Sequence, residues 1–268
     1  MFENKTVSSY YEFYPGVKMV NAIDKSFLIL EKIASSELPL TPAQIADELQ
    51  LNRATCSRIL KQLLDMGYAV KVSRQQGYAP GPKLHTMGMI CRYSSELLKC
   101  AIPVIDRCAA ELQSSVLLSR LCGGRRYILY HRNCNPDLHV NISRPCYNDI
   151  FGTATGLLLA AYCSKSERME CFKIQKHCGG TFIKEFSNAE TLNDMLDKIR
   201  QQGYVEMERG YQWLYAYPVK SGNHIDTAIG MSMLKSQHTP ELHRKICRVL
   251  AEAAQEISHY SEMKFVIG

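Results

Sequence analysis

The sequence predicts a two-domain protein of the α/β class, in its α+β form: a small winged helix-turn-helix and then a larger domain with an antiparallel sheet flanked by helices. Three observations predict it. Two short amphipathic helices and a glycine-tipped hairpin follow one another between Pro39 and Lys83. Beyond them, apolar strands and helices alternate. The chain has 268 residues, which leaves roughly 170 for a second domain, a usual domain size.

The first helix of the motif is predicted to begin at Pro42. In Thr41-Pro42-Ala43-Gln44, an N-cap hydroxyl, a proline at the first helical position and a glutamine three residues on form a capping box. Leu51 and Asn52 then break the helical register. We expect Asn52 to cap the second helix and Leu51 to pack against Cys56 as a hydrophobic staple. The connection between the helices is therefore only a few residues long.

The second helix, from Arg53 to Met66, has a buried side and an outward side. Its apolar stripe is formed by Cys56, Ile59, Leu60 and Leu63. The polar residues that it presents outward are Arg53, Thr55, Ser57, Arg58, Lys61 and Gln62. This layout is typical of a helix that lies in the major groove of DNA.

The elements on either side complete the motif. Gly67 stands where a left-handed C-cap is expected, and Tyr68 to Val72 alternate as a strand. The chain then turns through Ser73 to Gly77, with Arg74 and Gln75 at the tip of the wing. Upstream, Ile23, Phe27, Leu30 and Ala34 recur at helical spacing and predict the helix against which the other two pack.

Charge is distributed in the same way. From Asn52 to Lys83, six basic residues stand against Asp65, a net charge of +5, whereas Met1 to Leu51 has four basic and seven acidic residues, a net charge of −3. A positive recognition helix and wing are expected if they approach phosphates. The alternative is a helical hairpin inside a larger core, whose basic residues face only water. Agreement among caps, stripe, wing and charge favours the winged helix-turn-helix.

These residues also resemble a known family. The runs NAIDKSFLILEKIA, LTPAQIADELQLNRATCSRILKQLLDMGYAVKV and GYAPGPKLHTMG are similar to the N-terminal domain of the IclR family of bacterial transcriptional regulators. The resemblance implies that Thr55, Ser57 and Arg58, with Arg53 beside them, reach bases and backbone, and that Arg74 and Gln75 lie on the DNA-facing wing.

After the wing, Leu84 to Leu98 is predicted to be a helix that couples the domains stiffly. Helices are then predicted at 104–112, 153–163, 164–176, 189–202 and 240–260, and strands at 115–122, 127–131, 139–143, 213–220 and 225–234. The polar, tyrosine-rich start of the chain is expected to be a loose tail. It lacks the apolar core of a signal peptide, and the apolar run from Leu157 to Cys163 is too short to span a bilayer, so we expect no membrane partner and a cytoplasmic location.

The C-terminal half resembles the same family less closely. FGTATGLLLA, IRQQGY and AYPV match family blocks, and the resemblance implies a GAF-like effector-binding domain. Phe151 replaces the family's usual histidine, Leu157 its lysine and Leu214 its cysteine, and the loop from Gly203 to Trp213 is short. We therefore expect a small or altered pocket. By resemblance, its lining is Phe151, Gly152, Thr153, Leu214, Gly230 and Ser232, with Glu206 or Glu208 near its mouth.

The resulting domain organisation is a flexible tail (1–18), a winged helix-turn-helix (19–84), a linker helix (85–98) and a GAF-like effector-binding and oligomerisation domain (99–268). Within the last, Gly152 to Gly156 begin an apolar helix and could offer amides and hydroxyls to a carboxylate. The alternative is that glycine and threonine only allow the helix N-terminus to pack closely.

Enzymatic and metal-binding alternatives have weaker support. His131, Cys134 and His139 lie close in sequence and include the residue types of a nucleophile pair, but such residues in hairpin strands usually pack or face water. Cys171, His177 and Cys178 lack a fourth ligand and a standard zinc spacing. The eleven cysteines contain no C-x-x-C pair, which fits reduced, packed thiols. We expect no catalytic activity, no cofactor and no metal.

The sequence thus favours a sequence-specific regulator that binds double-stranded DNA at a pseudo-palindromic operator. The family resemblance further implies a homodimer or a dimer of dimers, modulated by a small organic acid from a catabolic pathway. A second hypothesis keeps the DNA binding but has the C-terminal domain only oligomerise and hold no metabolite.

Overall fold

The computed structural model describes residues 21–73, 75–136, 146–178, 189–222 and 224–265. The chain forms two compact units, with the boundary between Ser95 and Glu96. The predicted tail, Arg74, and the strand predicted at 139–143 lie outside the described residues. No helix in the described part of the chain is both long and apolar enough to cross a lipid bilayer.

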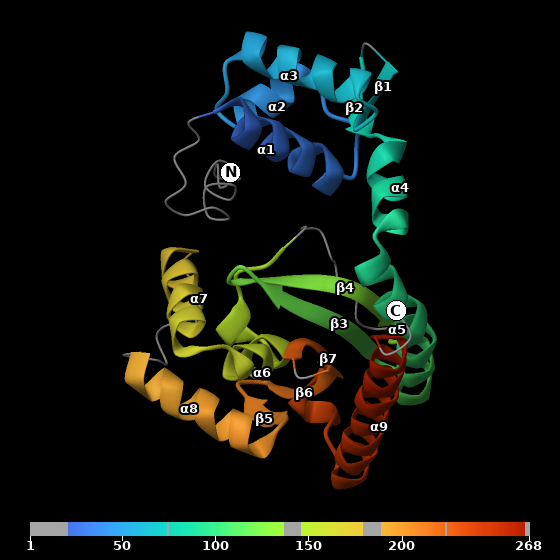
Figure 1. Cartoon of the computed structure of the whole chain (residues 1–268), viewed down its shortest axis with the longest axis vertical. Helices are drawn as coiled ribbons and strands as arrows, with labels where there is room; N and C mark the ends of the chain where they lie inside the picture. The colour runs from blue at the N-terminus through green and yellow to red at the C-terminus, as the bar shows by residue number, and fades with distance from the viewer. Residues whose placement is uncertain (1–20, 74, 137–145, 179–188, 223, 266–268) are drawn as a thin grey trace. The chain divides into compact units, whose positions relative to one another are not determined.

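The N-terminal unit begins with three helices and a two-stranded hairpin, which α4 (Pro82–Ile90) follows (Figure 1). They are α1 (Ala22–Ser35), α2 (Pro42–Glu48), α3 (Arg53–Asp65), β1 (Ala69–Ser73) and β2 (Gly77–Pro80). The predicted caps are confirmed. Thr41 and Gln44 form the reciprocal capping box of α2, and the Asn52 side chain accepts hydrogen bonds from the amides of Ala54 and Thr55 at the start of α3. These bonds satisfy donors that a helix N-terminus leaves unpaired.

One hydrophobic cluster joins the three helices, but α1 contributes a different side from the predicted one. Leu28, Ile29 and Ile33 are buried, whereas Ile23 and Phe27 are 64% and 61% exposed. The prediction of the stripe through Ile23 and Phe27 was therefore wrong. Most of the apolar residues of α1 form an arc wider than the side that packs, and Leu28 lies outside it, so helical spacing alone did not identify the buried side.

The hairpin is attached to the rest of this unit by a close backbone contact. Leu40 and Tyr78 form an isolated antiparallel bridge, with N···O distances of 2.9 and 2.8 Å. Gly77 lies against it, and a Cβ there would approach the Leu40 carbonyl oxygen to 2.2 Å at a φ of +92°. Only glycine tolerates this position. Gly67, with a φ of +80°, confirms the predicted left-handed C-cap of α3.

The helix predicted over 84–98 is interrupted. α4 (Pro82–Ile90) ends at Cys91, whose ψ of 92° is extended, and α5 (Arg92–Leu112) follows. α4 has no buried residue and contains Gly88, whose helix propensity is low. Neither packing nor propensity therefore favours continuing the helix through Cys91.

The C-terminal unit is built around a five-stranded antiparallel sheet in the order β4-β3-β7-β6-β5. Its strands are β3 (Ser115–Cys122), β4 (Arg125–Asn133), β5 (Val205–Arg209), β6 (Gln212–Ser221) and β7 (His224–Leu234). Its further helices are η1 (Ile150–Gly152), α6 (Ala154–Tyr162), α7 (Lys165–Cys178), α8 (Ala189–Gln202), η3 (Lys235–Gln237) and α9 (Pro240–Phe265). The segment read as a loop at 203–213 contains β5, which the sequence analysis missed.

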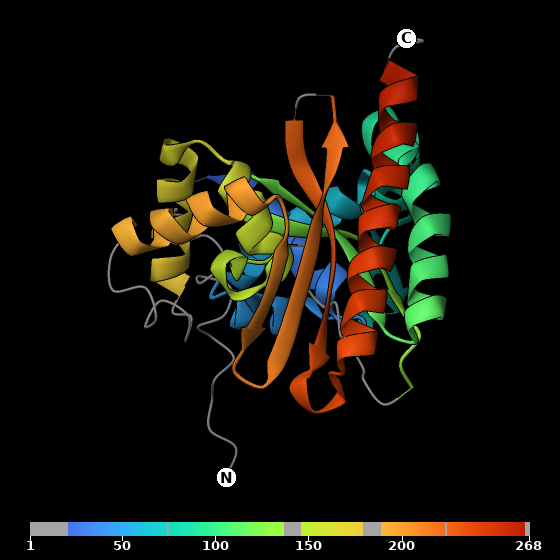
Figure 2. The same ribbon diagram turned by 90° about the horizontal axis from the view of Figure 1, so that it is seen from below.

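Helices cover both faces of this sheet (Figure 2). Tyr215, Ile229 and Met231 pack against α5 and α9, and we call this side the α9 face. Leu214, Ala216 and Ala228 alternate with them and pack against η1, α6 and α8 on the opposite side, the α6 face. The predicted antiparallel sheet flanked by helices is confirmed.

Candidate functional site

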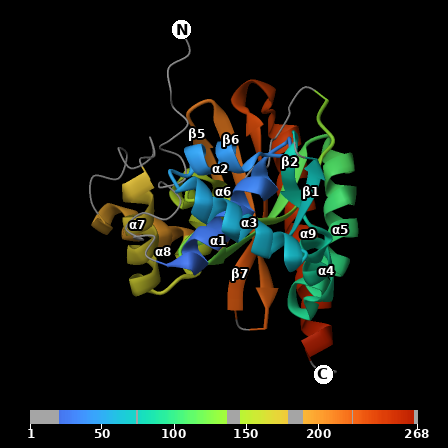
Figure 3. The ribbon, with the colours of Figure 1, turned by 90° about the horizontal axis from the view of Figure 1, so that it is seen from above.

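The outward side of α3 carries the polar residues that were predicted to face DNA. Cys56, Ile59, Leu60 and Leu63 are buried under the helix. The exposed residues are Arg53, Ser57, Arg58, Lys61 and Gln62, and Thr55 is half-buried. Figure 3 looks onto this unit, with α2, α3 and the hairpin turned toward the viewer. The side chains are therefore available to a partner from solution, as the predicted recognition helix requires.

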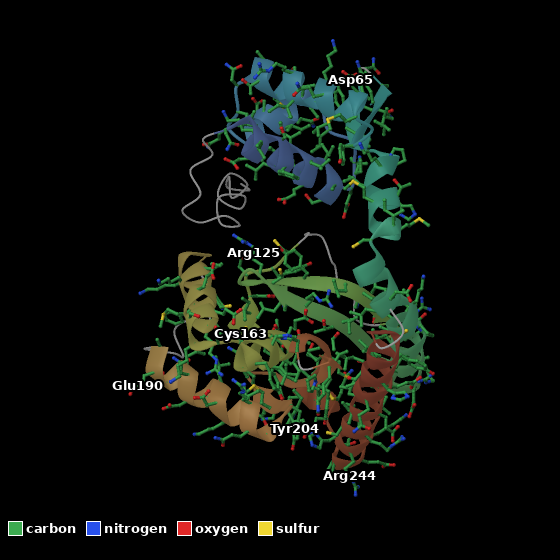
Figure 4. The ribbon with its side chains drawn as sticks, in the orientation of Figure 1. Asp65, Arg125, Cys163, Glu190, Tyr204 and Arg244 are labelled. Atoms are coloured by element: carbon green, nitrogen blue, oxygen red, sulfur yellow. The ribbon has the colours of Figure 1, made fainter. Side chains whose placement is uncertain are left out.

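The electrostatics of this surface are those of a cationic edge. Arg53 contacts both carboxylate oxygens of Asp47 at 3.2 Å, but both side chains are well exposed, so the pair is weak and easily exchanged for another anion. Arg58 has no ion-pair partner among the residues that the structure describes. The nearest acid along the helix is Asp65, at the C-terminal end of α3 (Figure 4). The first three turns of α3 thus present only cationic and neutral polar groups.

The wing extends this surface. Gln75 is exposed in the turn between β1 and β2, and the Ser73 hydroxyl accepts a hydrogen bond from the Gln76 amide at 2.9 Å. Lys71 is exposed on β1, and the Lys83 ammonium lies 4.6 Å from the centre of the Tyr68 ring. Arg74, the other predicted wing residue, lies outside the described residues.

Four of the residues predicted to line an effector pocket lie on the α6 face. Phe151 and Leu214 belong to one buried cluster and are only 2% and 4% exposed. Ser232 pairs with Leu214 across β7 and β6, and Gly230 lies two residues earlier on the same side of β7. A Cβ at Gly230 would meet the Thr155 methyl at 2.5 Å. The structure therefore packs Phe151, Leu214 and Gly230 in the core near the start of α6, and Ser232 is half-buried beside Leu214.

The N-terminus of α6 is packed closely, as the alternative interpretation of its glycines and threonines predicted. A Cβ on Gly156 would lie 2.0 Å from the Ile150 carbonyl oxygen. The Thr153 hydroxyl accepts a hydrogen bond from the Gly156 amide at 3.2 Å and so serves as the N-cap of the helix. Gly152 is half-buried, and its amide donates to the Asp149 carbonyl.

A buried cation lies beside this helix start, and the sequence analysis missed it. Arg126 on β4 is 4% exposed and holds the Asp149 carboxylate with three contacts of 3.0–3.1 Å. Its guanidinium also donates to Ser119, whose hydroxyl accepts from Thr155 at 3.3 Å. A signal for its burial was available in the hairpin. Arg126 pairs with Leu121, which packs against the buried cluster of the α6 face, and paired residues of neighbouring strands lie on the same face.

Glu206 is separated from the other predicted effector residues. It pairs with Tyr215 in the register of β5 and β6, so its side chain lies on the α9 face, with Tyr217, His243 and Cys247 around it. Burial and the neighbouring Glu206 raise the pKa of the Cys247 thiol to about 11. Glu208 is exposed and forms an ion pair with Lys235. The predicted grouping of Glu206 with Phe151 and Leu214 thus does not occur, because the sheet lies between them.

A cavity of about 390 Å³ opens at another part of the α6 face. Tyr162, Cys163, Arg200 and Asp226 are among its lining residues, and Figure 4 labels Cys163 at the end of α6. Asp226 precedes Ser232 by six residues on β7, or about 20 Å of extended strand. The cavity is therefore distinct from the predicted lining.

The residues weighed for catalysis or zinc show ordinary packing where they are described. His131 Nε2 lies 2.6 Å from the Ser115 hydroxyl, and burial lowers the pKa of this histidine. Burial raises the pKa of the Cys171 thiol to about 12, which keeps it neutral. His139 and the side chains of His177 and Cys178 lie outside the described residues.

Comparison with known proteins identifies both domains. Residues 22–73 match the IclR helix-turn-helix domain, and residues 92–259 match the bacterial transcriptional regulator IclR C-terminal domain. The chain is 23% identical over 255 residues to the Pca regulon regulatory protein of Pseudomonas putida, in a match that covers 90% of this chain and 84% of that protein.

Solved structures share the fold. An IclR transcriptional regulator from Alicyclobacillus acidocaldarius has a TM-score of 0.72 at 20% identity, covering 91% of this chain and 100% of that one. An IclR homologue from Microbacterium hydrocarbonoxydans, complexed with 4-hydroxybenzoate, has a TM-score of 0.71 at 17% identity, covering 90% of this chain and 99% of that one. Since the two family models span most of the sequence, the chain belongs to the IclR family of DNA-binding transcriptional regulators, which are not enzymes.

Proposed function

We propose that this regulator binds a pseudo-palindromic operator as a homodimer or a dimer of dimers, with α3 of each protomer in the major groove, and that a small organic acid bound to the C-terminal unit modulates the binding. The observation that carries the proposal is the solvent-facing cationic edge of α3, formed by Arg53, Arg58 and Lys61. Each half of a palindrome then matches one protomer of a two-fold dimer.

The roles on DNA follow from side-chain chemistry. Arginine and glutamine can make bidentate hydrogen bonds to guanine and adenine edges, so Arg58 and Gln62 are the proposed base readers. Contacts to DNA phosphates are proposed for Arg53, Ser57, Lys61 and the wing residue Gln75. The smaller side chain of Thr55 would let the helix approach the sugar-phosphate backbone of the DNA closely. Arg74 is proposed as a further phosphate contact from its position in the sequence.

For the effector, the Arg126 and Asp149 pair supports a carboxylate ligand. A buried guanidinium held by a carboxylate is a preformed anion site, and a ligand carboxylate can replace Asp149, whose side chain is 45% exposed, without leaving the cation unpaired. Thr155, Ser119 and Gly230 lie next to this pair under α6. The 4-hydroxybenzoate complex of the Microbacterium homologue supports the same class of ligand.

The DNA part is tested by footprinting the protein on the region upstream of its own gene and measuring affinity for the protected segment by fluorescence anisotropy. We expect protection of two related half-sites, and affinity for this duplex well above that for a shuffled duplex. Equal affinity for both duplexes would contradict sequence-specific binding.

The effector part is tested by a thermal-shift screen with small carboxylates, including 4-hydroxybenzoate. A ligand at 100 times its Kd stabilises the native state by about 2.7 kcal/mol. Asp149→Asn removes the competing carboxylate and should tighten the binding of a ligand, whereas Asp194→Asn on the exposed side of α8 should leave it unchanged. Failure of all carboxylates with both the wild type and Asp149→Asn would instead favour a C-terminal unit that only oligomerises.

A further inference from the structure

Three side chains of different ligand type converge on the α9 face, away from both sites described above. Glu206 comes from β5, and His243 and Cys247 lie one turn apart on α9. His243 Nε2 is 3.7 Å from a Glu206 carboxylate oxygen and 3.7 Å from the Cys247 sulfur, and all three ligand atoms lie within 4.8 Å of one another. In tetrahedral zinc sites, bonds of about 2.0–2.3 Å place neighbouring ligand atoms about 3.3–3.8 Å apart. The cluster is close to that geometry.

The partners of these ligands orient them toward a common point. The Tyr215 hydroxyl lies 2.9 Å from His243 Nδ1, so the other ring nitrogen, Nε2, is the one that faces Glu206 and Cys247. The Tyr217 hydroxyl donates a hydrogen bond to Glu206 Oε1 and leaves Oε2 toward the histidine. Metal-binding histidines and carboxylates characteristically have such outer hydrogen bonds, which set the tautomer and the direction of the lone pair.

Aromatic rings enclose the cluster. Trp213 packs edge-on against His243 with ring centres 5.3 Å apart, and Tyr204 stacks on Tyr217 at 5.5 Å. Figure 4 labels Tyr204 on the side of the C-terminal unit where β5 begins. Partial exclusion of water by these rings strengthens the attraction between a bound cation and the carboxylate.

An unpartnered histidine beside the cluster is an independent indication of a ligand. His238 Nε2 is buried and has no hydrogen-bond partner in the described part of the chain, although buried polar atoms are nearly always paired. Its ring stacks on Trp213 at 4.3 Å, and its centre is 5.2 Å from that of His243. The three clustered ligand atoms do not include a nitrogen of His238, so its ring would have to move toward them to become the fourth ligand.

We propose that Glu206, His243 and Cys247 bind a zinc ion, with His238 or a water molecule as the fourth ligand. The set of one carboxylate, one or two imidazoles and one thiolate selects this class of metal. Sulfur excludes magnesium and calcium, which take oxygen ligands, and mixed nitrogen, sulfur and oxygen ligands in a tetrahedral arrangement favour Zn²⁺.

The ion would connect an edge strand to the terminal helix. β5 lies at the edge of the sheet and pairs only with β6, whereas α9 packs mainly on β6 and β7. A bond from Glu206 through zinc to His243 and Cys247 links β5 to α9 directly. The site is on the opposite face of the sheet from Arg126 and Thr155, so it is independent of the proposed effector binding, and either proposal can fail alone.

The first test uses the full chain, stripped with a chelator and titrated with Co²⁺ as a spectroscopic substitute and Zn²⁺ by calorimetry. We expect one ion per chain, a sub-micromolar Kd for zinc, visible d–d absorption of tetrahedral cobalt and a thiolate-to-cobalt charge-transfer band. An octahedral cobalt spectrum without the charge-transfer band would overturn the proposal, and this readout does not depend on any variant.

The second test compares variants. Cys247→Ser should abolish the charge-transfer band and the rise of Tm on adding zinc, whereas Cys122→Ser, at an exposed thiol of β3, should keep both. Tyr215→Phe, which removes only the hydroxyl beside His243 Nδ1, should weaken zinc binding about 10- to 100-fold while keeping the spectrum. Equal zinc responses in wild type and Cys247→Ser, or their loss in Cys122→Ser, would place the metal elsewhere and contradict the assignment.

Discussion

Arg58 is the side chain on which base discrimination depends most in the proposed DNA complex. It is exposed on α3 and has no ion-pair partner among the described residues, so no ion pair within the protein has to break when its guanidinium binds a base. We expect Arg58→Ala to weaken binding to the operator by about 1–3 kcal/mol, and to weaken binding to a shuffled duplex much less. Anisotropy titrations with both duplexes at one salt concentration measure the difference.

The matched control for this prediction is Arg58→Lys. Lysine keeps the positive charge but lacks the planar bidentate fork, so it should retain most of the affinity for shuffled DNA and lose much of the preference for the operator. If both variants lost the same affinity on both duplexes, Arg58 would be a phosphate contact and would not read bases.

Asn52 stabilises the start of α3, next to the residues proposed to contact DNA. Its side chain caps α3 by accepting from the amides of Ala54 and Thr55 at 2.9 and 3.3 Å. Asn52→Ala should lower the stability of the N-terminal unit by about 1 kcal/mol, seen as a lower midpoint in denaturant followed by circular dichroism. Asn52→Asp retains a good cap and should keep the stability, but its negative charge beside the phosphates should weaken DNA binding. A loss of stability in both variants would contradict the capping role.

At the scale of elements, Gly156 allows the start of α6 to pack closely against the backbone of Ile150. Alanine normally stabilises a helix by about 1 kcal/mol relative to glycine. At Gly156, however, the new Cβ would lie 2.0 Å from the Ile150 carbonyl oxygen. We expect Gly156→Ala to destabilise the C-terminal unit by about 1–3 kcal/mol through overpacking.

Gly88 in α4 is the control, because a Cβ there meets nothing within 4 Å. Gly88→Ala should leave the C-terminal unit unchanged and raise the helicity of α4, since only the intrinsic propensity acts. Thermal melts of the two variants beside the wild type, followed by far-UV circular dichroism, measure both effects. Equal stabilisation by both substitutions would show that α6 is not packed as described.

Arg168 joins three helices. It is 3% exposed on α7, and its guanidinium donates to the carbonyls of Ala160 and Ala161 at the end of α6 and to Asp197 on α8. Arg168→Met should cost about 2–5 kcal/mol, because the Ala161 and Ala160 carbonyls lose the guanidinium, and of the two the Ala160 carbonyl still accepts from the Cys163 amide. Arg244→Met, at an exposed arginine whose hydrogen bond within the described residues goes to the Pro240 carbonyl of its own helix, should change the unfolding midpoint little.

The same contact adds a dependence on pH. The Arg168 guanidinium holds the pKa of Asp197 below its usual range. A carboxyl whose pKa is lowered by folding contributes stability above its unfolded pKa of about 3.9, and this contribution is lost as the pH falls through the folded value. The difference in Tm between wild type and Asp197→Asn should therefore shrink below about pH 4, and an unchanged difference from pH 7 to pH 3 would contradict this assignment.

Local signals in the sequence predicted the N-terminal unit well, and relations between distant strands escaped prediction. The caps at Thr41 and Asn52 act within three residues, so spacing alone identified them. The side of α1 that packs depends on α2 and α3, and Ile23 and Phe27 were misplaced for that reason. Glu206 was misplaced because its face depends on the register of β5 with β6, and β5 itself is short, charged and at the edge of the sheet.

At the scale of the whole molecule, the proposed effector response requires the two compact units to be coupled through the chain that joins them. The only described chain between the winged helix-turn-helix and the sheet runs through α4, Cys91 and α5, and the backbone leaves the helical conformation at Cys91. A joint of this kind lets a change in the C-terminal unit alter the spacing of two recognition helices in a dimer without unfolding either unit. Ligand and DNA would then be coupled through the spacing that the dimer prefers.

That coupling makes the spacing of the operator half-sites a sensitive measurement. Two-fold dimers bind half-sites separated by about one helical turn, 10–10.5 base pairs, or by a multiple of it. Inserting five base pairs between the half-sites turns one of them to the opposite side of the duplex, so we expect affinity to fall to that of a single half-site. Inserting ten base pairs returns both half-sites to the same side of the duplex and should recover part of the affinity. A carboxylate effector should change the ratio of the affinity for the original operator to the affinity for the operator with ten inserted base pairs. Equal affinity for all three duplexes in electrophoretic mobility shifts would mean that each protomer binds DNA independently, and the dimeric mode would have to be abandoned.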